Sequence, residues 1–444
     1  MSATVTAATA KPKLVVAGLS ARLMAEAAAR DGYGVIALDA FGDIDTQRAA
    51  LRWQPIGRPG EPRLDAQGLL SSLAEAAAEP GVLGWVAGSD LECEPELLER
   101  GAASLPLIGT QADAVRRVRD PAVFFAALDA LELPHPETQL HVPDDPRGWL
   151  CKHARSAGGW HIRPADSTHA IQPERQPYFQ REQAGTPMSA LFIGNGSQAR
   201  LIGCQELIVR ALGTRPCVYR GAIGPLPLPS ARLSSLDAML QTLTRTFALR
   251  GLASLDFIDD GRQFRLLEIN PRPSASMGLY GGPVMRGHVE ACLEGRLPAA
   301  TLAGRDDDGH RHEQGPEDED AGAGDARPAR WADRHEPALR GSEIVFARTA
   351  LRLSATQASA LAARADCHDL PAAGSRFEAG DPVCSVSASG SSVAAVRAEL
   401  ADKRRRLRDE WAVGNNLPDS TDPLSPSPPG RGKYNQRITK VSNE

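Results

Sequence analysis

The stretch from Leu266 to Ser276 combines side chains that could bind a metal ion and a phosphate. It reads LLEINPRPSAS, with Glu268, Asn270 and Arg272 at steps of two residues. Alternate side chains of a strand point to the same face, so the acid, the amide and the guanidinium would project together. Carboxylate and amide oxygens suit Mg²⁺, and a guanidinium suits a phosphoryl group.

A second carboxylate comes from the segment just before this one. Asp256 lies in LASLDFID, and the turn-rich DDGRQ separates the two segments. If they form a hairpin, its loop sets which residues share a face. A two-residue turn at Asp260 and Gly261 puts Asp256 on the face opposite to Glu268. A loop centred on Arg262 instead places the two carboxylates directly opposite each other, with Cβ atoms within ~5.5 Å, and this register predicts a Mg²⁺ site. Surface ion pairs on a half-exposed strand are the alternative.

A lysine and a pair of glycines form a second constellation. In WLCKHARSAGGWHI an apolar strand presents Lys152, and Gly158 and Gly159 follow it. Glycine lets the backbone approach a ligand closely, so a cation would lie beside a loop that can contact phosphate. A plain hairpin is the alternative for this segment taken alone.

These segments, in this order and rough spacing, resemble the ATP-grasp superfamily. The resemblance rests on Lys152 with its glycine loop, YFQREQAGTPMSALF, LDFI and LEINPR, and it extends over most of the chain. It implies a nucleotide between two α+β lobes, with one or two Mg²⁺ ions, or Mn²⁺, on the ATP phosphates. By this resemblance the metal ligands are Asp256, Glu268 and Asn270, the catalytic cations are Lys152 and Arg272, and the nucleotide-binding residues are Lys152, Gly158, Gly159, Gln180, Arg181 and Glu182.

The same resemblance implies an ATP-dependent carboxylate–amine ligase. ATP would phosphorylate a small-molecule carboxylate, with glutamate as one candidate, and an amine would attack the acyl phosphate. The pattern is most similar to carboligase-type members that include tyramine–glutamate ligases and proteins of tetrahydromethanopterin-linked one-carbon pathways, which suggests coenzyme biosynthesis.

Two alternatives remain open. Gln180 and Pro187 stand where ribose-binding acids are frequent in the superfamily, and Pro121 replaces a common lysine. These departures would suit a nucleotide sensor that has lost turnover. A carboxylase-like member that uses bicarbonate is the second alternative.

The N-terminal part of the chain alternates strand-like and helical segments. The strands are expected at 13–18, 33–41, 82–88 and 105–109, and the helices at 20–31, 64–79 and 95–103. This alternation is typical of a parallel sheet covered on both faces, so residues 1–112 are predicted to form a doubly wound α/β domain. The segment VVAGLSARL lacks the three glycines of a dinucleotide fingerprint, which argues against hydride chemistry. The polar residues that follow these strands are further candidates for a substrate site, namely Asp43, Asp45, Ser89, Asp90 and Glu92.

The rest of the chain divides by composition. A helix over 112–131 and several short β segments predict an α+β ATP-grasp domain at 113–300, with antiparallel pairing. An acidic, disordered insertion is expected at 301–338. A small β-rich C-terminal domain with a helix over 391–411 is expected at 339–412, followed by a disordered tail at 413–444.

Composition narrows the partners and the location. The 444 residues carry a net charge of −5 spread along the chain, which argues against the strongly cationic surface that nucleic-acid binding requires, and the basic run at 403–408 is expected to be an exposed helix face. The seven cysteines include no CxxC pair, so reduced thiols in a cytoplasmic protein are expected. No apolar run approaches the ~20 residues that span a bilayer, so neither a membrane nor export is expected. The expected partners are a small carboxylate and an amine, and the oligomeric state stays open.

Deleting residues 306–336 should leave the melting temperature nearly unchanged. The segment is acidic, rich in glycine and almost free of aliphatic side chains that could be buried. Thermal unfolding of the full chain and of the deletion variant, followed by circular dichroism, measures this. A drop of more than about 4 °C, on the order of 1–2 kcal/mol of lost stability, would mean that the segment packs against the rest of the protein.

Overall fold

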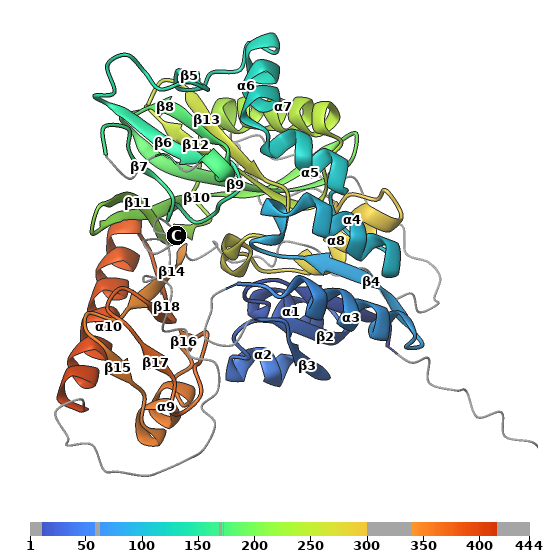
Figure 1. Cartoon of the computed structure of the whole chain (residues 1–444), viewed down its shortest axis with the longest axis vertical. Coiled ribbons are helices and arrows are strands. Elements are labelled where there is room, and N and C mark those ends of the chain that lie inside the picture. Colours follow the sequence, from blue (N-terminus) through green and yellow to red (C-terminus); the bar gives the residue numbers. More distant parts are fainter. Residues whose placement is uncertain (1–10, 58–62, 168–170, 172, 300–338, 415–444) are drawn as a thin grey trace, which may run out of the picture.

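The computed structural model describes residues 11–57, 63–167, 171, 173–299 and 339–414. The predicted acidic insertion and the predicted tail from residue 415 on lie outside these residues. The N-terminal α/β domain, the middle domain and the C-terminal region contact one another (Figure 1). No helix in the described part of the chain combines the length and the apolar composition needed to span a bilayer.

The N-terminal domain has the predicted parallel sheet. Four strands lie in the order β3-β2-β1-β4, namely Arg52–Pro55, Gly34–Asp39, Lys13–Ala17 and Val82–Ala87. The strand expected at 105–109 is reduced to one bridge between Trp85 and Leu107. The helices are α1 (Arg22–Arg30), α2 (Ile44–Ala49), α3 (Ala66–Ala77) and α4 (Pro95–Ser104), with a short 3₁₀ turn, η1, at Leu91–Cys93.

Both faces of this sheet are buried, as a parallel sheet requires. Leu14 and Val16 of β1 belong to the core under α1, whereas Val15 and Ala17 belong to the core under α3 and α4. The alternation of side chains along β1 therefore explains why KLVVA is apolar throughout.

The helix expected over 112–131 is two helices, because Asp120 breaks it. Asp120 has an extended backbone and caps α6, accepting hydrogen bonds from the backbone N–H groups of Ala122 at 2.8 Å and Val123 at 3.4 Å. Pro121 then opens α6 at the first helical position, where its missing N–H is harmless. The helices are α5 (Ala112–Arg119) and α6 (Pro121–Ala130).

The middle domain contains a small sheet and most of a large one. The small antiparallel sheet has the order β5-β8-β6-β7, namely Thr138–Gln139, Pro177–Arg181, Trp149–His153 and Arg163–Pro164, with a 3₁₀ turn, η2, at Pro173–Arg175. The first five strands of the large antiparallel sheet are β13 (Phe264–Asn270), β12 (Arg250–Asp259), β9 (Thr186–Asn195), β10 (Ala199–Leu212) and β11 (Arg215–Gly224). Two helices that the sequence did not predict pack on it, α7 (Ser230–Phe247) and α8 (Val284–Leu293), and η3 (Ala275–Leu279) precedes α8.

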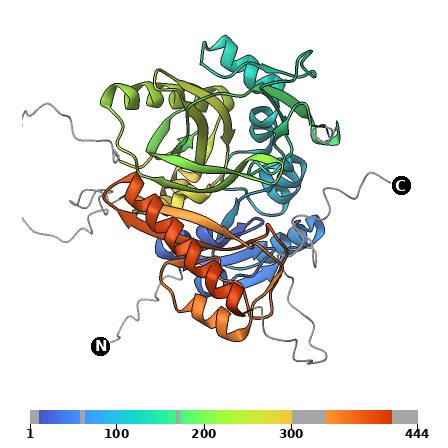
Figure 2. The same cartoon turned by 90° about the vertical axis from the view of Figure 1, so that its left-hand side faces the viewer.

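The C-terminal region extends the same large sheet. β14 (Leu339–Phe346) pairs with β11, and β18 (Pro382–Gly390) and β16 (Cys367–His368) continue beyond it. α10 (Val393–Gly414) packs on β14 and β18, and Figure 2 shows it running across these strands. The remaining elements are β15 (Leu351–Arg352), β17 (Arg376–Phe377) and α9 (Ala355–Ala362).

A buried arginine joins the N-terminal domain to the C-terminal region. Arg22 of α1 donates to Asp369 Oδ1 at 2.8 Å and to Glu26 Oε2 at 2.8 Å, with only 6% of its side chain exposed. Asp45 accepts hydrogen bonds from the backbone N–H groups of Asp369 at 2.7 Å and Leu370 at 3.0 Å. Asp45 thus has a structural role at this interface.

Arg22→Met should lower the free energy of unfolding by about 3 kcal/mol, because it leaves the carboxylates around Arg22 without their shared cation. Urea unfolding followed by tryptophan fluorescence measures the loss. Arg30→Met, on the same helix with 55% of its side chain exposed, is the matched control and should cost less than about 1 kcal/mol. Equal losses in the two variants would contradict a specific role for Arg22.

Candidate active site

The hairpin of β12 and β13 has Asp256 directly opposite Glu268, the register that a metal site requires. The loop is not centred on Arg262, because Asp259 pairs with Phe264 at its base. A one-residue β-bulge corrects the register: Phe257 pairs with Leu266 and Asp256 with Glu268, leaving Leu267 as the extra residue. Without this bulge Leu267 would stand opposite Asp256, so the bulge is what aims Glu268 at the site.

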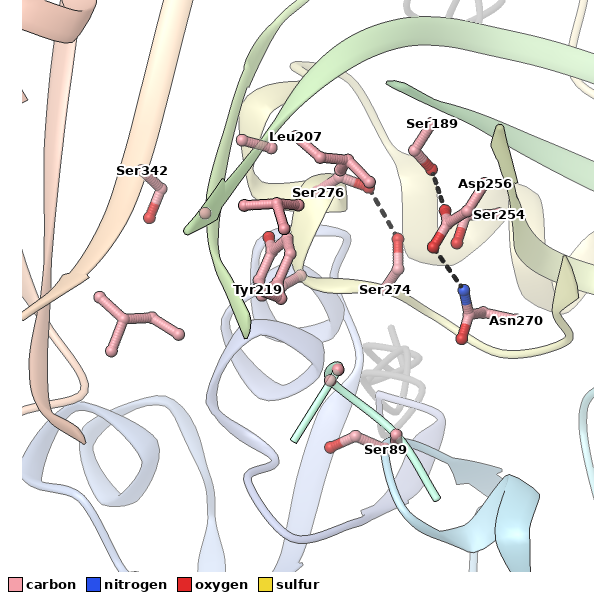
Figure 3. A pocket seen from close by; sticks show the side chains of 18 of the residues that line it. Ser89, Ser189, Leu207, Tyr219, Ser254, Asp256, Asn270, Ser274, Ser276 and Ser342 are labelled. Carbon is pink, nitrogen blue, oxygen red and sulfur yellow. Dashed lines mark hydrogen bonds between the residues drawn. The ribbon is translucent and has the colours of Figure 1, made fainter. Parts of the chain in front are cut away.

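Asp256 is held by its neighbours on both sides. Its Oδ1 accepts from Ser189 Oγ at 2.6 Å, and its Oδ2 accepts from Asn270 Nδ2 at 3.2 Å (Figure 3). Burial, together with the charge of Glu268, raises the pKa of Asp256 to about 7. Asp256, Glu268 and Asn270 therefore gather at one place, as the sequence predicted.

Arg119, a residue that sequence reasoning missed, contacts this group. Its Nη1 donates to Glu268 Oε2 at 2.9 Å, and its Nη2 donates to the carbonyl oxygens of Ala154 at 2.8 Å and Ser156 at 2.7 Å. Burial lowers the pKa of Arg119, but the charge of Glu268 and smaller contributions outweigh it and leave the pKa raised. Arg119 thus brings a fixed cation close to the position where Pro121 replaces the expected lysine. The one sequence feature that could have pointed to Arg119 is its position directly before Asp120 and Pro121, where the helix breaks.

Lys152 lies on β6 and reaches the same region. Its Nζ donates to Gln180 Oε1 at 2.6 Å, and Gln180 Nε2 donates to Thr138 Oγ1 at 3.0 Å. Burial lowers the pKa of Lys152, whereas the negative charges of Glu268 and Asp256 oppose that shift. Gln180 therefore orients the ammonium group that the sequence assigned to phosphate binding.

The two glycines adopt a conformation that other residues rarely reach. Gly158 and Gly159 have φ values of 67° and 74°. The backbone N–H of Tyr219 donates to Gly158 O at 3.2 Å, and a Cβ on Gly159 would lie 1.9 Å from Cys217 O. The turn is thus fixed against β11 by close backbone approach, which only glycine allows.

The three predicted residues at 180–182 are placed differently from one another. Gln180 is buried, and the Arg181 guanidinium lies over the Trp149 ring at 4.7 Å and donates to Arg147 O at 3.0 Å. The Arg181 side chain is therefore engaged by Trp149 and Arg147. The backbone N–H of Glu182 donates to Gly148 O at 2.9 Å, and the Glu182 side chain is exposed.

Arg272 connects the hairpin to the N-terminal domain. Its Nε donates to Glu92 Oε1 at 2.6 Å, and its Nη2 donates to Asn270 Oδ1 at 3.4 Å. Burial and the charge of Glu92 raise the pKa of the nearby Asp90 to about 7. Of the polar candidates after the N-terminal strands, Asp90 and Glu92 thus form a charged cluster with Arg272.

A cavity of about 790 Å³ joins these groups. The N-terminal domain contributes Ser89 and Phe41, the hairpin contributes Asp256 and Glu268, and the C-terminal region contributes Ser342. In Figure 3, Ser89 and Ser342 come from elements across the cavity from Asp256, with Ser274 and Ser276 beside it. All ten predicted site residues line this cavity: Lys152, Gly158, Gly159, Gln180, Arg181, Glu182, Asp256, Glu268, Asn270 and Arg272.

Other polar residues have local structural contacts. Asp39 accepts hydrogen bonds from Trp53 Nε1 and from the Gly42 backbone N–H, each at 2.8 Å. The rings of His153 and His161 pack edge to face with centroids 6.0 Å apart. The seven cysteines, all within the described residues, are not paired in disulfide bonds.

The donor set suits Mg²⁺. Asp256 and Glu268 repel each other across the hairpin, and a divalent cation between them would replace this repulsion by attraction. The available donors are hard oxygens, which Mg²⁺ prefers. Within the described residues no three His, Cys, Asp or Glu side chains gather as metal ligands, so the predicted set stays two carboxylates and an amide. These residues would hold the ion, and their role as ligands stays a prediction.

Residues 119–276 match the model of a family described as "ATP-grasp domain". This match identifies an ATP-grasp domain at residues 119–276 and supports the resemblance to the ATP-grasp superfamily that the motifs indicated. A comparison with curated protein sequences finds no match.

Several solved structures share the fold over nearly the whole chain. N5-carboxyaminoimidazole synthase from Aspergillus clavatus, in complex with ADP and 5-aminoimidazole ribonucleotide, superposes with a TM-score of 0.60 at 12% identity, covering 90% of this chain and 99% of that one. Biotin carboxylase from Campylobacter jejuni has a TM-score of 0.62 at 11% identity, covering 91% and 97%. L-amino acid ligase from Bacillus licheniformis has a TM-score of 0.57 at 11% identity, covering 90% and 98%. At these identities the likeness concerns the fold.

Asp256→Asn should stabilise the metal-free protein at pH 8 by at least about 1 kcal/mol. The pKa of this carboxyl is raised to about 7 in the folded state, above its ordinary ~3.9, so its contribution to stability falls as pH rises from about 4 to about 7. Asparagine keeps the shape, can still bond Ser189 and Asn270, and removes the charge.

Urea unfolding in EDTA at pH 8 and at pH 5 measures the difference, which should shrink at the lower pH. Asp259→Asn is the matched control on the same strand, where the carboxylate pairs with Arg232 at 2.7 Å, and it should give no stabilisation at pH 8. A loss of stability in Asp256→Asn at pH 8 would contradict the repulsion between the two carboxylates.

Proposed function

We propose that this chain is a Mg²⁺-dependent ATP-grasp ligase that joins a small-molecule carboxylate to an amine. The observation that carries the proposal is the register of β12 and β13, which sets Asp256 opposite Glu268 on the wall of a cavity that Lys152 also lines. The match of residues 119–276 to the ATP-grasp domain and the name of the L-amino acid ligase support it. Glutamate as the acid, a role in coenzyme biosynthesis and a cytoplasmic location belong to the same proposal.

The first step would transfer the γ-phosphoryl group of ATP to the substrate carboxylate. A carboxylate oxygen forms a bond to the γ-phosphorus, the bond to the bridging oxygen breaks, and ADP leaves. Negative charge is spread over phosphoryl oxygens in this step, and Lys152, oriented by Gln180, would neutralise part of it. Mg²⁺ held by Asp256, Glu268 and Asn270 would supply further charge neutralisation.

The second step would form the amide. The amine lone pair attacks the acyl carbon, the carbon–oxygen bond to phosphate breaks, phosphate leaves and the amine loses a proton. Asp90, with its pKa raised to about 7, lies on the cavity wall and could take that proton near neutral pH. Arg272, held by Glu92, is the cation that would face the phosphoryl group.

A bicarbonate-dependent reaction is the second candidate function. It is favoured by the names of two neighbours, N5-carboxyaminoimidazole synthase and biotin carboxylase, which share the fold over about nine-tenths of this chain. In that reaction bicarbonate would take the place of the substrate carboxylate, and the phosphoryl transfer would involve the same residues.

The purified protein should release ADP from ATP in the presence of Mg²⁺ only when a particular acid and amine are both supplied. Pools of amino acids and amines, with ADP measured by a coupled assay, identify the pair, and strict dependence on added bicarbonate would indicate the carboxylase-like reaction instead. Absence of turnover with every pool, despite ATP binding, would favour a non-catalytic sensor.

Glu268→Gln should lower ATP turnover by at least about a hundredfold while leaving the fold intact, because glutamine keeps the shape and removes a charged oxygen ligand. Steady-state ADP release measures the loss, and circular dichroism checks the fold. Glu99→Gln, at a carboxylate that is 69% exposed on α4, is the control and should turn over ATP like the unmodified protein. Retained activity in Glu268→Gln would remove the metal-site assignment.

A further inference from the structure

Five arginines gather on the face of the large sheet that α10 covers, away from the cavity. Arg210 lies on β10, Arg220 on β11 and Arg348 just after β14, while Arg404 and Arg408 are one turn apart on α10. On β14, Ser342 faces the cavity, and the next residue, Glu343, contacts Arg404 of α10. The arginines therefore lie on the opposite side of the sheet from the proposed ATP site.

A register irregularity builds this cluster. Ile208 pairs with Gly221 and Val209 pairs with Tyr219, so Arg220 is the extra residue of a β-bulge in β11. Its guanidinium lies over the Phe346 ring at 5.0 Å, and its Nη2 donates to Ala211 O at 3.2 Å. The side chain is about nine-tenths buried, yet its Nε has no hydrogen-bond partner. A buried N–H without a partner is costly, which calls for an acceptor at this place.

The cluster carries more positive charge than its surroundings balance. Glu343 contacts Arg404, and Arg408 Nε donates to Phe346 O at 3.2 Å. Of the other acids of α10, Asp402 pairs with Arg405 and Arg406, and Glu410 pairs with Arg364. This excess arises in a chain whose net charge is −5, so it is a local feature.

Burial and repulsion by neighbouring arginines lower the pKa values of Arg220, Arg404 and Arg408. Burial and the positive charge of Arg210 lower the pKa of Arg220. Burial and the positive charges of Arg404, Arg348 and Arg220 lower the pKa of Arg408 to about 10. Burial also lowers the pKa of Arg404, which contacts Glu343, and the positive charges of Arg210 and Arg220 lower it further.

We propose that this cluster is a binding site for a small, soluble, multivalent oxyanion of the phosphate class. Guanidiniums bind phosphate through paired, charge-assisted hydrogen bonds, and a phosphate or pyrophosphate group would supply both the missing acceptor and the missing negative charge. The site does not depend on the proposed ligase activity. Phe346, which the Arg220 guanidinium covers, also lines the cavity, so the two sites share this side chain. Trp160, next to the glycine pair, packs on the Phe346 ring with ring centroids 5.9 Å apart.

Inorganic pyrophosphate should bind the full chain saturably in EDTA at constant ionic strength. Isothermal titration calorimetry measures the affinity. The double variant Arg210→Gln, Arg348→Gln removes two exposed members of the cluster without disturbing the core, and Arg220→Met removes the buried one. Each should weaken binding about tenfold or more, the factor that corresponds to losing one charge-assisted hydrogen bond.

Two controls separate this site from other sources of anion affinity. The double variant Arg405→Gln, Arg406→Gln makes the same change in charge on α10, at residues paired with Asp402, and should bind like the unmodified chain. Lys152→Met weakens phosphate contacts in the cavity and should also leave this binding unchanged.

Three results would overturn the proposal. They are an unmodified chain that shows no saturable binding, equal losses in the two double variants, and a loss confined to Lys152→Met. Vesicles containing phosphatidylserine distinguish a lipid headgroup from a soluble anion. Binding to vesicles through Arg210 and Arg348, without pyrophosphate binding, would also contradict the soluble ligand.

Discussion

The site depends on holding two like charges opposite each other on one hairpin. Asp256 and Glu268 occupy directly paired positions, an arrangement that ordinarily destabilises a sheet. The protein tolerates it because Ser189 and Asn270 donate to Asp256 and Arg119 donates to Glu268. Each of these three partners comes from the sheet or from a helix packed against it. The rigid framework therefore maintains a repulsion that a bound cation would relieve.

Long-range ion pairs fix the parts of the molecule that enclose the cavity. Arg272 reaches Glu92 of the N-terminal domain, and Arg22 reaches Asp369 of the C-terminal region. All four groups line the cavity or lie next to it. Removing one partner of a buried ion pair strongly destabilises a protein, because the other charge stays buried without compensation. The relative position of the three parts is therefore sensitive to single substitutions at the cavity wall. The contacts that hold the three parts together thus also help to form the cavity wall.

The period of two in LLEINPR was enough to predict that Glu268 and Asn270 share a face, and the turn residues before it indicated a hairpin with Asp256. The bulge at Leu267 could not be predicted, because nothing in the local sequence distinguishes an extra leucine from a paired one. Arg119 was missed because its partner Glu268 is 149 residues away and the Asp120 break that aims it was read as continuous helix. Similarly, β14 joins the large sheet through pairing with β11, a tertiary contact that strand propensity does not encode.

The two polar sites of the large sheet are built by the same local device. A bulge in β13 turns Glu268 toward the cavity, and a bulge in β11 turns Arg220 toward α10, so one sheet carries an acidic site on one face and a basic site on the other. Bulges suit this purpose because an extra residue re-aims a side chain without ending the strand pairing. In both places the re-aimed side chain meets like charges, which would be unfavourable without a ligand of opposite charge. These two irregularities of register therefore coincide with the two proposed binding sites, where like charges are held close together.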